Sequence, residues 1–313
     1  LYTLKNYSFI HLWRTSISTK GSVKYIYIFI LSADIRNKTN LNHMFSLFKK
    51  KIIVPHVRLT GVIGSAGRFR QGIDFSGQQE IIKKAFSFKK AKNIAISINS
   101  PGGSPVQSHL IHDYIRQLAV KNKKKVIVFA EDVAASGGYL IACAGDEIYA
   151  NSSSIVGSIG VISASFGFQD AIKKIGIQRR VYTAGKNKST LDPFKEEKEE
   201  DIQRIKKLQL ELHSDFINLV KKSRGSKLKD AEKNNIFTGE FWSGSASLKL
   251  GLIDGIGNAE QILREKFGEN IEIKKLEKPK GFIARKLSSS LDNQIDSIAS
   301  AIEERAMWQK YGL

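Results

Sequence analysis

The fold of this 313-residue chain is predicted from one stretch, Val133-Ala134-Ala135-Ser136-Gly137-Gly138-Tyr139-Leu140. Ser136 lies between small residues, and the run from Tyr139 to Ala144 predicts a short buried helix. At such a turn the glycines leave room for a ligand, and the first N–H groups of the helix have no partner within it. An ordinary strand-to-helix turn and a nucleophilic serine facing an oxyanion site both fit this pattern.

Alternating strands and helices are expected on both sides of the serine turn. The expected strands are 52–59, 93–98, 125–130, 146–150 and 178–183, and the expected helices are 76–88, 106–118, 169–175 and about 195–223. Pro55 suggests that the first strand lies at an edge of the sheet. The buried stripe of the last helix is expected to be Ile202, Ile205, Leu208, Leu212, Phe216 and Leu219. Strands separated by helices predict an α/β protein with a parallel or mixed sheet.

Composition excludes several classes of protein. With 42% hydrophobic and 26% charged residues, the chain is neither disordered, collagenous nor a membrane bundle. The single cysteine, Cys143, cannot form an internal disulfide, and its small neighbours indicate core packing. The net charge of +20 raises the possibility of nucleic-acid binding, but the lysines are dispersed and no aromatic residues are interleaved with them. We therefore expect a solvated basic surface and no nucleic-acid partner.

The two ends of the chain differ from the middle. Residues 1–43 show no sustained period, and the apolar run Val23 to Ala33 is shorter than the roughly 18 residues that a spanning helix needs. This part is interpreted either as a signal-like segment or, preferably, as a leader of doubtful authenticity upstream of Met44. Residues 44–270 are expected to form the main domain, and residues 271–313 a helical tail. An apolar stripe in the tail could contact a partner helix; it comprises Leu291, Ile295, Ile298 and Ile302.

A second glycine-rich turn could complete a site around Ser136. Asn99-Ser100-Pro101-Gly102-Gly103 follows an expected strand, where its loop could present a backbone N–H to a ligand. Gly103 and Gly137 would then be the two donors of an oxyanion hole.

The group that would activate Ser136 is less evident from the residues alone. The histidines of the main domain, which are His56, His109, His112 and His213, are each more typical of structural or solvated positions. A lysine base needs its pKa lowered by about three units from about 10.4, which corresponds to about 4 kcal/mol and requires desolvation.

Four motifs occur in order along residues 52–260: Asn99 to Gly103, Ala135-Ser136-Gly137-Gly138-Tyr139, Gly157-Ser158-Ile159-Gly160-Val161, and Gly185-x-x-Lys188. Together they resemble peptidase family S49, the group of signal peptide peptidase A and SohB. The resemblance implies an α/β fold of the Clp-protease/crotonase type, with a mixed sheet and flanking helices, and a Ser/Lys dyad. Its pattern gives Ser136 as nucleophile, Lys188 as general base in preference to Lys186, and Ser158 as the serine that orients the lysine.

The function implied by this resemblance is that of a serine endopeptidase without a metal or organic cofactor. Its substrates would be peptides or small proteins, with signal-peptide remnants as one candidate. A homo-oligomer is expected, because short members of the family can complete the site between neighbouring subunits. The expected location is cytoplasmic or peripheral at the inner membrane, where the basic stretch Met44 to Lys51 could contact the membrane surface. The alternative is a non-covalent, crotonase-like acyl-binding protein.

Overall fold

The structure is a computed structural model that describes residues 51–64, 72–277 and 305–313. The predicted leader, residues 1–43, and the predicted tail stripe, Leu291 to Ile302, lie outside the described residues.

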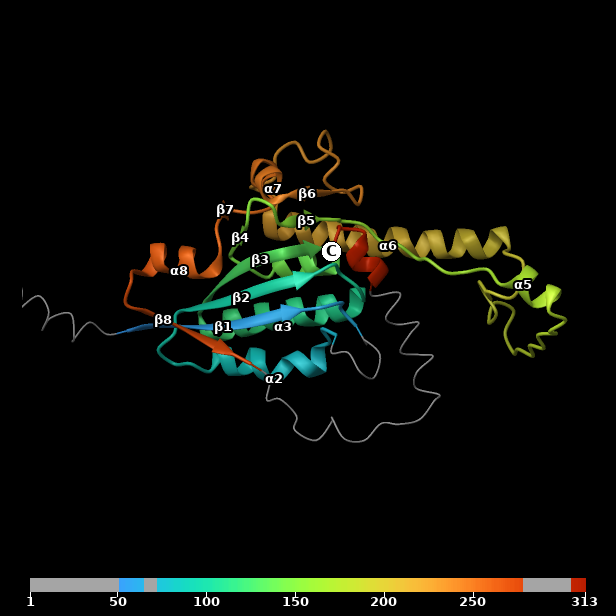
Figure 1. Cartoon of the computed structure of the whole chain (residues 1–313), viewed down its shortest axis with the longest axis horizontal. Coiled ribbons are helices and arrows are strands. Elements are labelled where there is room, and N and C mark those ends of the chain that lie inside the picture. The colour runs from blue at the N-terminus through green and yellow to red at the C-terminus, as the bar shows by residue number, and fades with distance from the viewer. Residues whose placement is uncertain (1–50, 65–71, 278–304) are drawn as a thin grey trace, which may run out of the picture. The chain divides into compact units, whose positions relative to one another are not determined.

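The centre of the fold is an eight-stranded sheet with the order β6-β5-β3-β2-β1-β8, in which β4 also pairs with β3 and β7 (Figure 1). Its strands are β1 (Ile52–Thr60), β2 (Asn93–Ser100), β3 (Lys125–Ala135), β4 (Glu147–Ala150), β5 (Ile155–Gly157), β6 (Phe241–Ser243), β7 (Gly255–Ile256) and β8 (Ile271–Leu276). Every pairing is parallel except that of β5 with β6. The predicted α/β class with a mixed sheet is therefore confirmed.

Strand β1 corrects one expectation. It pairs with β2 on one side and with β8 on the other, so it is an interior strand although it contains Pro55. The alternating apolar residues Ile271 and Ile273 make the start of the expected helical tail a sheet strand, β8, instead. Residues 305–309 of the tail are helical.

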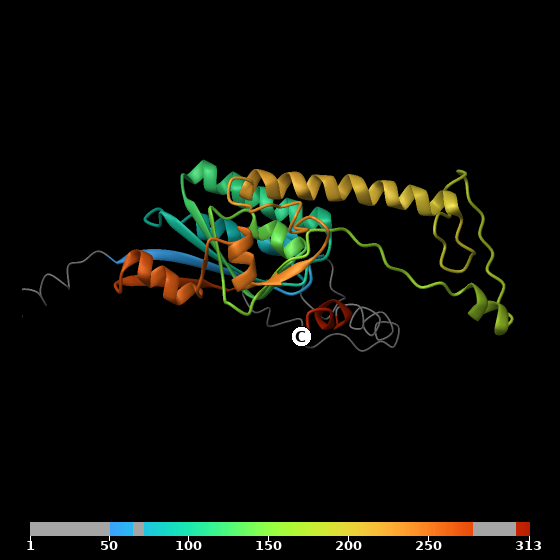
Figure 2. The same cartoon turned by 90° about the horizontal axis from the view of Figure 1, so that it is seen from above.

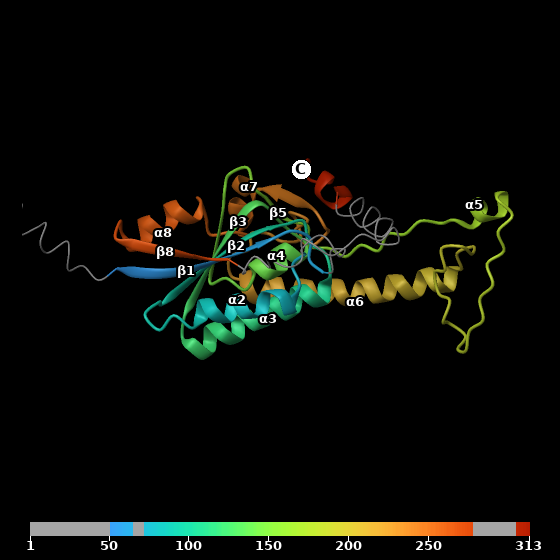
Figure 3. The same cartoon turned by 60° about the horizontal axis from the view of Figure 1, so that its bottom comes forward.

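The two faces of the sheet carry different layers. One face packs against α2 (Phe75–Phe86), α3 (Pro105–Asn122), α4 (Gly137–Ala142) and the C-terminal part of α6 (Glu199–Arg224), and together they form the main core. The other face packs against α8 (Ala259–Phe267) in a smaller core (Figure 3). The remaining helices are α5 (Gln169–Lys174) and α7 (Gly244–Leu250).

Local capping explains where the first helices begin. The side chain of Asp74 accepts a hydrogen bond from the N–H of Gly77 at 2.8 Å, and Ser104 caps α3 just before Pro105. These residue types satisfy N–H groups that a helix leaves unpaired, and proline is tolerated at the first helical position. Both helices pack against the same face of the sheet through the main core.

Helix α6 packs against the core through its C-terminal part. Its buried residues are Phe216, Val220 and Arg224, and Arg224 forms a 2.7 Å ion pair with Asp254. The N-terminal half extends beyond the sheet, together with the segment of residues 161–198 that contains α5 (Figures 1 and 2). We call residues 161–198 the arm.

Two sequence predictions fail in this part of the chain. The expected strand 178–183 has no regular secondary structure, and Leu208 of the expected buried stripe is exposed. Both predictions assumed a core beneath these residues. The arm and the first half of α6 have no sheet beneath them, so among the described residues their apolar side chains lie outside the core (Figure 2).

Candidate active site

Ser136 lies at the junction of β3 and α4 in an unusual backbone conformation. Its φ is 51° and its ψ is −123°, and it occupies the position before the first residue of α4. A positive φ costs a non-glycine residue of the order of 1–3 kcal/mol, so the surrounding structure must enforce it. The Ser136 N–H donates to the Gly157 carbonyl at 2.8 Å, which holds the turn in place.

The Asn99 to Gly103 loop lies directly against this turn. A Cβ built on Gly102 would lie 2.7 Å from the Cβ of Ser136 and 3.1 Å from the nitrogen of Gly137. Gly137 is the first residue of α4, so its N–H is one of those that the helix leaves unpaired. Within the described residues, the Gly103 N–H donates no hydrogen bond to a backbone carbonyl. The Asn99 to Gly103 loop and the Ser136 turn, which the sequence analysis expects to form one site, are therefore neighbours.

The Gly157 to Val161 motif adjoins the same turn. Strands β3 and β5 pair so that Ala135 is opposite Gly157, and this places Ser158 beside the serine turn. Ser158 is only 5% exposed and has a φ of 56°. Its N–H donates to the Glu240 carbonyl at 2.6 Å. Three of the four predicted motifs thus meet at one end of the sheet.

The fourth motif, which contains Lys188, is not brought to this place within one chain. Lys188 is exposed in a turn of the arm, where its N–H donates to the Gly185 carbonyl at 3.2 Å. The arm closes on itself through a 3.1 Å ion pair of Arg179 with Asp192 and through a tilted contact of the Phe168 and Phe194 rings, whose centroids are 5.6 Å apart. Within the described residues, the Lys188 side chain forms no hydrogen bond or ion pair.

Sequence reasoning missed two residues that lie near the serine turn. The Nε2 of His213 on α6 lies 3.0 Å from the carbonyl oxygen of Ile159. The sequence favours a structural or solvated position for His213, and no periodicity signals its contact with a loop 54 residues away. Tyr311, near the end of the chain, packs in an apolar cluster with Val133 and Ala135 of β3, and no motif marks it.

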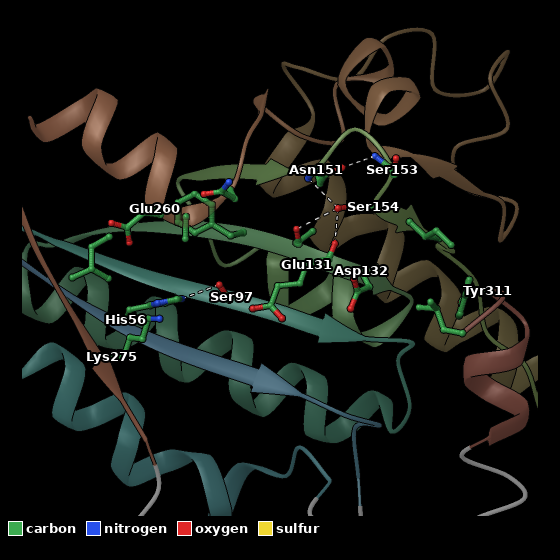
Figure 4. A pocket seen from close by; sticks show the side chains of 17 residues that line it. His56, Ser97, Glu131, Asp132, Asn151, Ser153, Ser154, Glu260, Lys275 and Tyr311 are labelled. Atoms are coloured by element: carbon green, nitrogen blue, oxygen red, sulfur yellow. Dashed lines mark hydrogen bonds between the residues drawn. The ribbon is translucent and has the colours of Figure 1, made fainter. Parts of the chain in front are cut away.

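A cavity of about 620 Å³ lies on the sheet face that also carries α8 (Figure 4). None of the predicted site residues lines it. His56 lies on its floor, where its Nε2 is 2.8 Å from the Ser97 hydroxyl, and burial lowers the pKa of His56. Tyr311 stands at one end of the cavity (Figure 4).

We also searched the described residues for a cysteine nucleophile, a metal site and a membrane-spanning helix. Burial raises the pKa of the Cys143 thiol to about 12, so this cysteine is not a nucleophile near neutral pH. Among residues 51–64, 72–277 and 305–313, no group of three His, Cys, Asp or Glu side chains could hold a metal ion. No helix within these same ranges is long and apolar enough to cross a membrane.

The fold and the site define an α/β protein whose serine is held on a strand-to-helix turn between two glycine loops. Residues 119–270 match the sequence model of peptidase family S49. This segment contains Ser136, Ser158 and Lys188, and it belongs to that family. The resemblance predicted from the four motifs is therefore confirmed.

Relatives extend the similarity to most of the chain. A protein of Brucella abortus (strain 2308) named Na(+)/H(+) antiporter NhaA is 52% identical over 273 residues, which are 83% of this chain and 37% of that protein. The probable protease SohB of Buchnera aphidicola subsp. Schizaphis graminum is 31% identical over 198 residues, which are 61% of this chain and 55% of that protein. The chain thus spans from about a third to about half of the length of these relatives.

Among solved structures, the chain is similar to a mutant of the 1510-N membrane-bound stomatin-specific protease. The TM-score is 0.44 at 18% identity, and the alignment covers 74% of this chain and 100% of that one.

Proposed function

We propose that the chain is a serine endopeptidase in which Ser136 attacks the carbonyl carbon of a peptide bond. The observation that carries this proposal is the positive φ of Ser136 at the N-terminus of α4, with Gly102 packed against it. A strained strand-to-helix turn exposes a serine hydroxyl, and the glycine loop leaves space for the scissile carbonyl beside it.

The N–H groups of Gly103 and Gly137 would stabilise the oxyanion that forms in this attack. A buried pair of such donors is worth more than the same groups in water, because they are already oriented. The proton of Ser136 passes to a general base and then to the leaving amine, and water releases the acyl group from the serine.

The general base in the proposal is the amine of Lys188, with Ser158 as the residue that orients it. Since the arm carries Lys188 away from the Ser136 turn in the same chain, we propose that Lys188 reaches Ser136 of a neighbouring copy. The arm exposes large apolar side chains that such a contact would bury: Ile162 is 82% exposed, Phe166 72% and Tyr182 90%. Their burial would also desolvate Lys188, which a neutral amine base requires.

The substrate class proposed is a peptide or small protein, and signal-peptide remnants are one candidate. The relationship to family S49 supports a peptide substrate.

A fluorophosphonate probe, which reacts with activated serines, tests the proposal. We expect labelling of the full chain to be lost in Ser136→Ala and Lys188→Ala and retained in Lys186→Ala. Lys186 is the matched control because it lies in the same exposed turn. If the unaltered chain is not labelled but binds acyl compounds, the result would instead indicate the non-covalent acyl-binding protein.

A further inference from the structure

Strands β2 and β3 pair out of step just before the two turns of the site. The pairs Ile98–Ala130 and Ser100–Ala134 enclose fewer residues of β2 than of β3. The extra residues of β3 form a β-bulge, which bends the strand and interrupts its ladder of backbone hydrogen bonds. Asn99 is the residue of β2 that lies opposite this bulge.

The side chain of Asn99 bonds to the bulge through both of its polar atoms. Its Oδ1 accepts a hydrogen bond from the Val133 N–H at 3.2 Å, and its Nδ2 donates to Oδ2 of Asp132 at 2.6 Å. Asn99 is only 7% exposed, so an unpaired amide in its place would lose hydrogen bonds that water could not replace. The Asn99 side chain therefore restores the hydrogen bonding that the bulge interrupts.

The backbone of Asn99 is held from the other side by the end of β1. Its carbonyl oxygen accepts a hydrogen bond from the Gly61 N–H at 3.0 Å, and Thr60 lies opposite Asn99 in the parallel pairing of β1 with β2. Asn99 thus joins the ends of three neighbouring strands.

Both turns of the proposed site begin at this junction. The chain runs from Asn99 into the Gly103 loop, and it runs from the bulge into the Ser136 turn. The turns are packed closely, since a Cβ built on Gly138 would lie 2.7 Å from the carbonyl oxygen of Ser100. A shift of β2 against β3 would therefore move the Gly103 N–H relative to Ser136, and an oxyanion hole depends on that placement.

Asp132 lies outside the proposed site. It is exposed and lines the cavity on the sheet face that carries α8, which none of the predicted site residues lines (Figure 4). Its described side-chain hydrogen bond is the one from Asn99. An effect of Asp132 on the serine would therefore pass through Asn99.

We propose that Asn99 is a positioning residue of the proteolytic site, with Asp132 as its support. Its side chain fixes the register of β2 against β3 and so sets the spacing between the Gly103 N–H and the Ser136 hydroxyl. This inference rests on the proposed function, since it takes Gly103 as a donor to the oxyanion.

The first test is Asn99→Asp in the full chain, measured as the rate of fluorophosphonate labelling of Ser136 per folded molecule. This substitution keeps the size of the side chain and an acceptor for the Val133 N–H, but it places a second carboxylate against Asp132, and like charges repel. We expect the maximal labelling rate to fall about tenfold, as loss of a hydrogen bond to a charged group implies. The probe concentration at half-maximal rate should stay unchanged, because oxyanion donors act in the transition state.

The reciprocal substitution provides the rescue. Asp132→Asn supplies an amide donor opposite the new carboxylate, so combining it with Asn99→Asp exchanges the two groups and is expected to recover most of the labelling rate. Asp132→Asn alone should lower the rate by less than about twofold, because an amide oxygen can still accept from Asn99. Asp132→Ala removes the acceptor at an exposed position, where the chain should still fold, and should lower the rate about threefold.

Ser97→Ala is the matched control. Ser97 is also a buried polar residue of β2, and its hydroxyl lies 2.8 Å from Nε2 of His56, away from the bulge. It is expected to label at the unaltered rate. Unaltered labelling of both Asn99→Asp and Asp132→Ala, or no recovery of Asn99→Asp by Asp132→Asn, would overturn the positioning role while leaving the peptidase proposal intact. Absence of any Ser136-dependent labelling in the unaltered chain would overturn both.

Discussion

Gly102 lies so close to Ser136 that residue 102 has no room for a side chain. A Cβ there would lie 2.7 Å from the Cβ of Ser136, and the φ of Gly102 is 109°. Gly102→Ala must therefore push the serine turn away from the Gly103 loop. Because a displacement of about 1 Å can cost about a hundredfold in rate, we expect fluorophosphonate labelling to fall by about that factor.

The control for this substitution is Gly268→Ala, which separates backbone strain from contact. Gly268 also has a positive φ, 86°, but a Cβ there would meet nothing within 4 Å. Both variants should lose some stability through the disfavoured φ, measured as thermal unfolding, and only Gly102→Ala should lose labelling. Equal labelling by the two variants would contradict a site built between the two loops.

Mixing of two inactive variants tests whether Ser136 and Lys188 come from different copies. If each site takes its serine from one copy and its lysine from a neighbour, an equal mixture of Ser136→Ala and Lys188→Ala chains contains intact sites. Random assembly predicts labelling of about a quarter of that of the unaltered protein. A dyad within one chain predicts no recovery after the chains are mixed, unfolded together and refolded.

The exposed apolar residues of the arm predict a change in assembly. Ile162→Asp introduces a charge where the proposed contact between copies would exclude water, so we expect a lower molecular mass by light scattering and weaker labelling. Val120→Asp is the control, since Val120 is 71% exposed on α3, outside the arm. An unchanged molecular mass for Ile162→Asp would contradict the proposal that the arm forms the contact between copies.

The sequence allowed the centre of the fold to be predicted because its signals there are local. Apolar runs such as 93–98 and 125–130 alternate with expected helices, and both are strands of the sheet. The glycines of the Gly102 and Gly137 turns are needed for close approach of two loops, so residue type alone indicated that these turns meet. Parallel strands then bring their carboxyl ends to one edge of the sheet.

The parts that could not be predicted depend on contacts distant in sequence. The periodicity of α6 predicts an apolar stripe, but it does not predict which half of the helix packs against the core. The buried residues are Phe216, Val220 and Arg224, all in the C-terminal half. Pro55 suggests an edge strand because proline lacks a backbone N–H. The pairing of β1 with β8 has no local signal in β1, since β8 follows more than 200 residues later. Tyr311 and His213 carry no motif. Tyr311 packs against Val133 and Ala135 of β3, and His213 contacts the Ile159 carbonyl, so both contacts join residues far apart in the sequence.

The ion pair of Arg224 with Asp254 predicts a dependence of stability on pH. Although burial alone would raise the pKa of Asp254, hydrogen bonds from Arg224 and Lys227 hold it below the ordinary value of 3.8. A lowered pKa in the folded state contributes stability at pH values above about 4, and this contribution is lost as the pH falls through the folded pKa. Arg224 is 1% exposed, so Asp254→Asn leaves a buried charge unpaired and should cost about 3 kcal/mol in unfolding free energy at pH 7.

The difference between the unaltered chain and Asp254→Asn should shrink below about pH 4, as measured by denaturant unfolding across a pH series. Asp170→Asn is the control, because the Lys173–Asp170 pair is exposed at 3.6 Å and should leave stability unchanged. A constant difference at all pH values would show that Asp254 acts through packing and not through its charge.

The single cysteine provides a test that the nucleophile is a serine. Since the chain contains only Cys143 and burial raises the pKa of its thiol to about 12, the thiolate is scarce near neutral pH and the sulfur is enclosed. We expect iodoacetamide to leave the folded chain unmodified and to add one adduct by mass spectrometry once denaturant unfolds it. Folded protein treated in this way should keep its full fluorophosphonate labelling. Rapid alkylation of the folded chain, together with loss of that labelling, would mean that the thiol near α4 is accessible and that Ser136 is not the only candidate for attack.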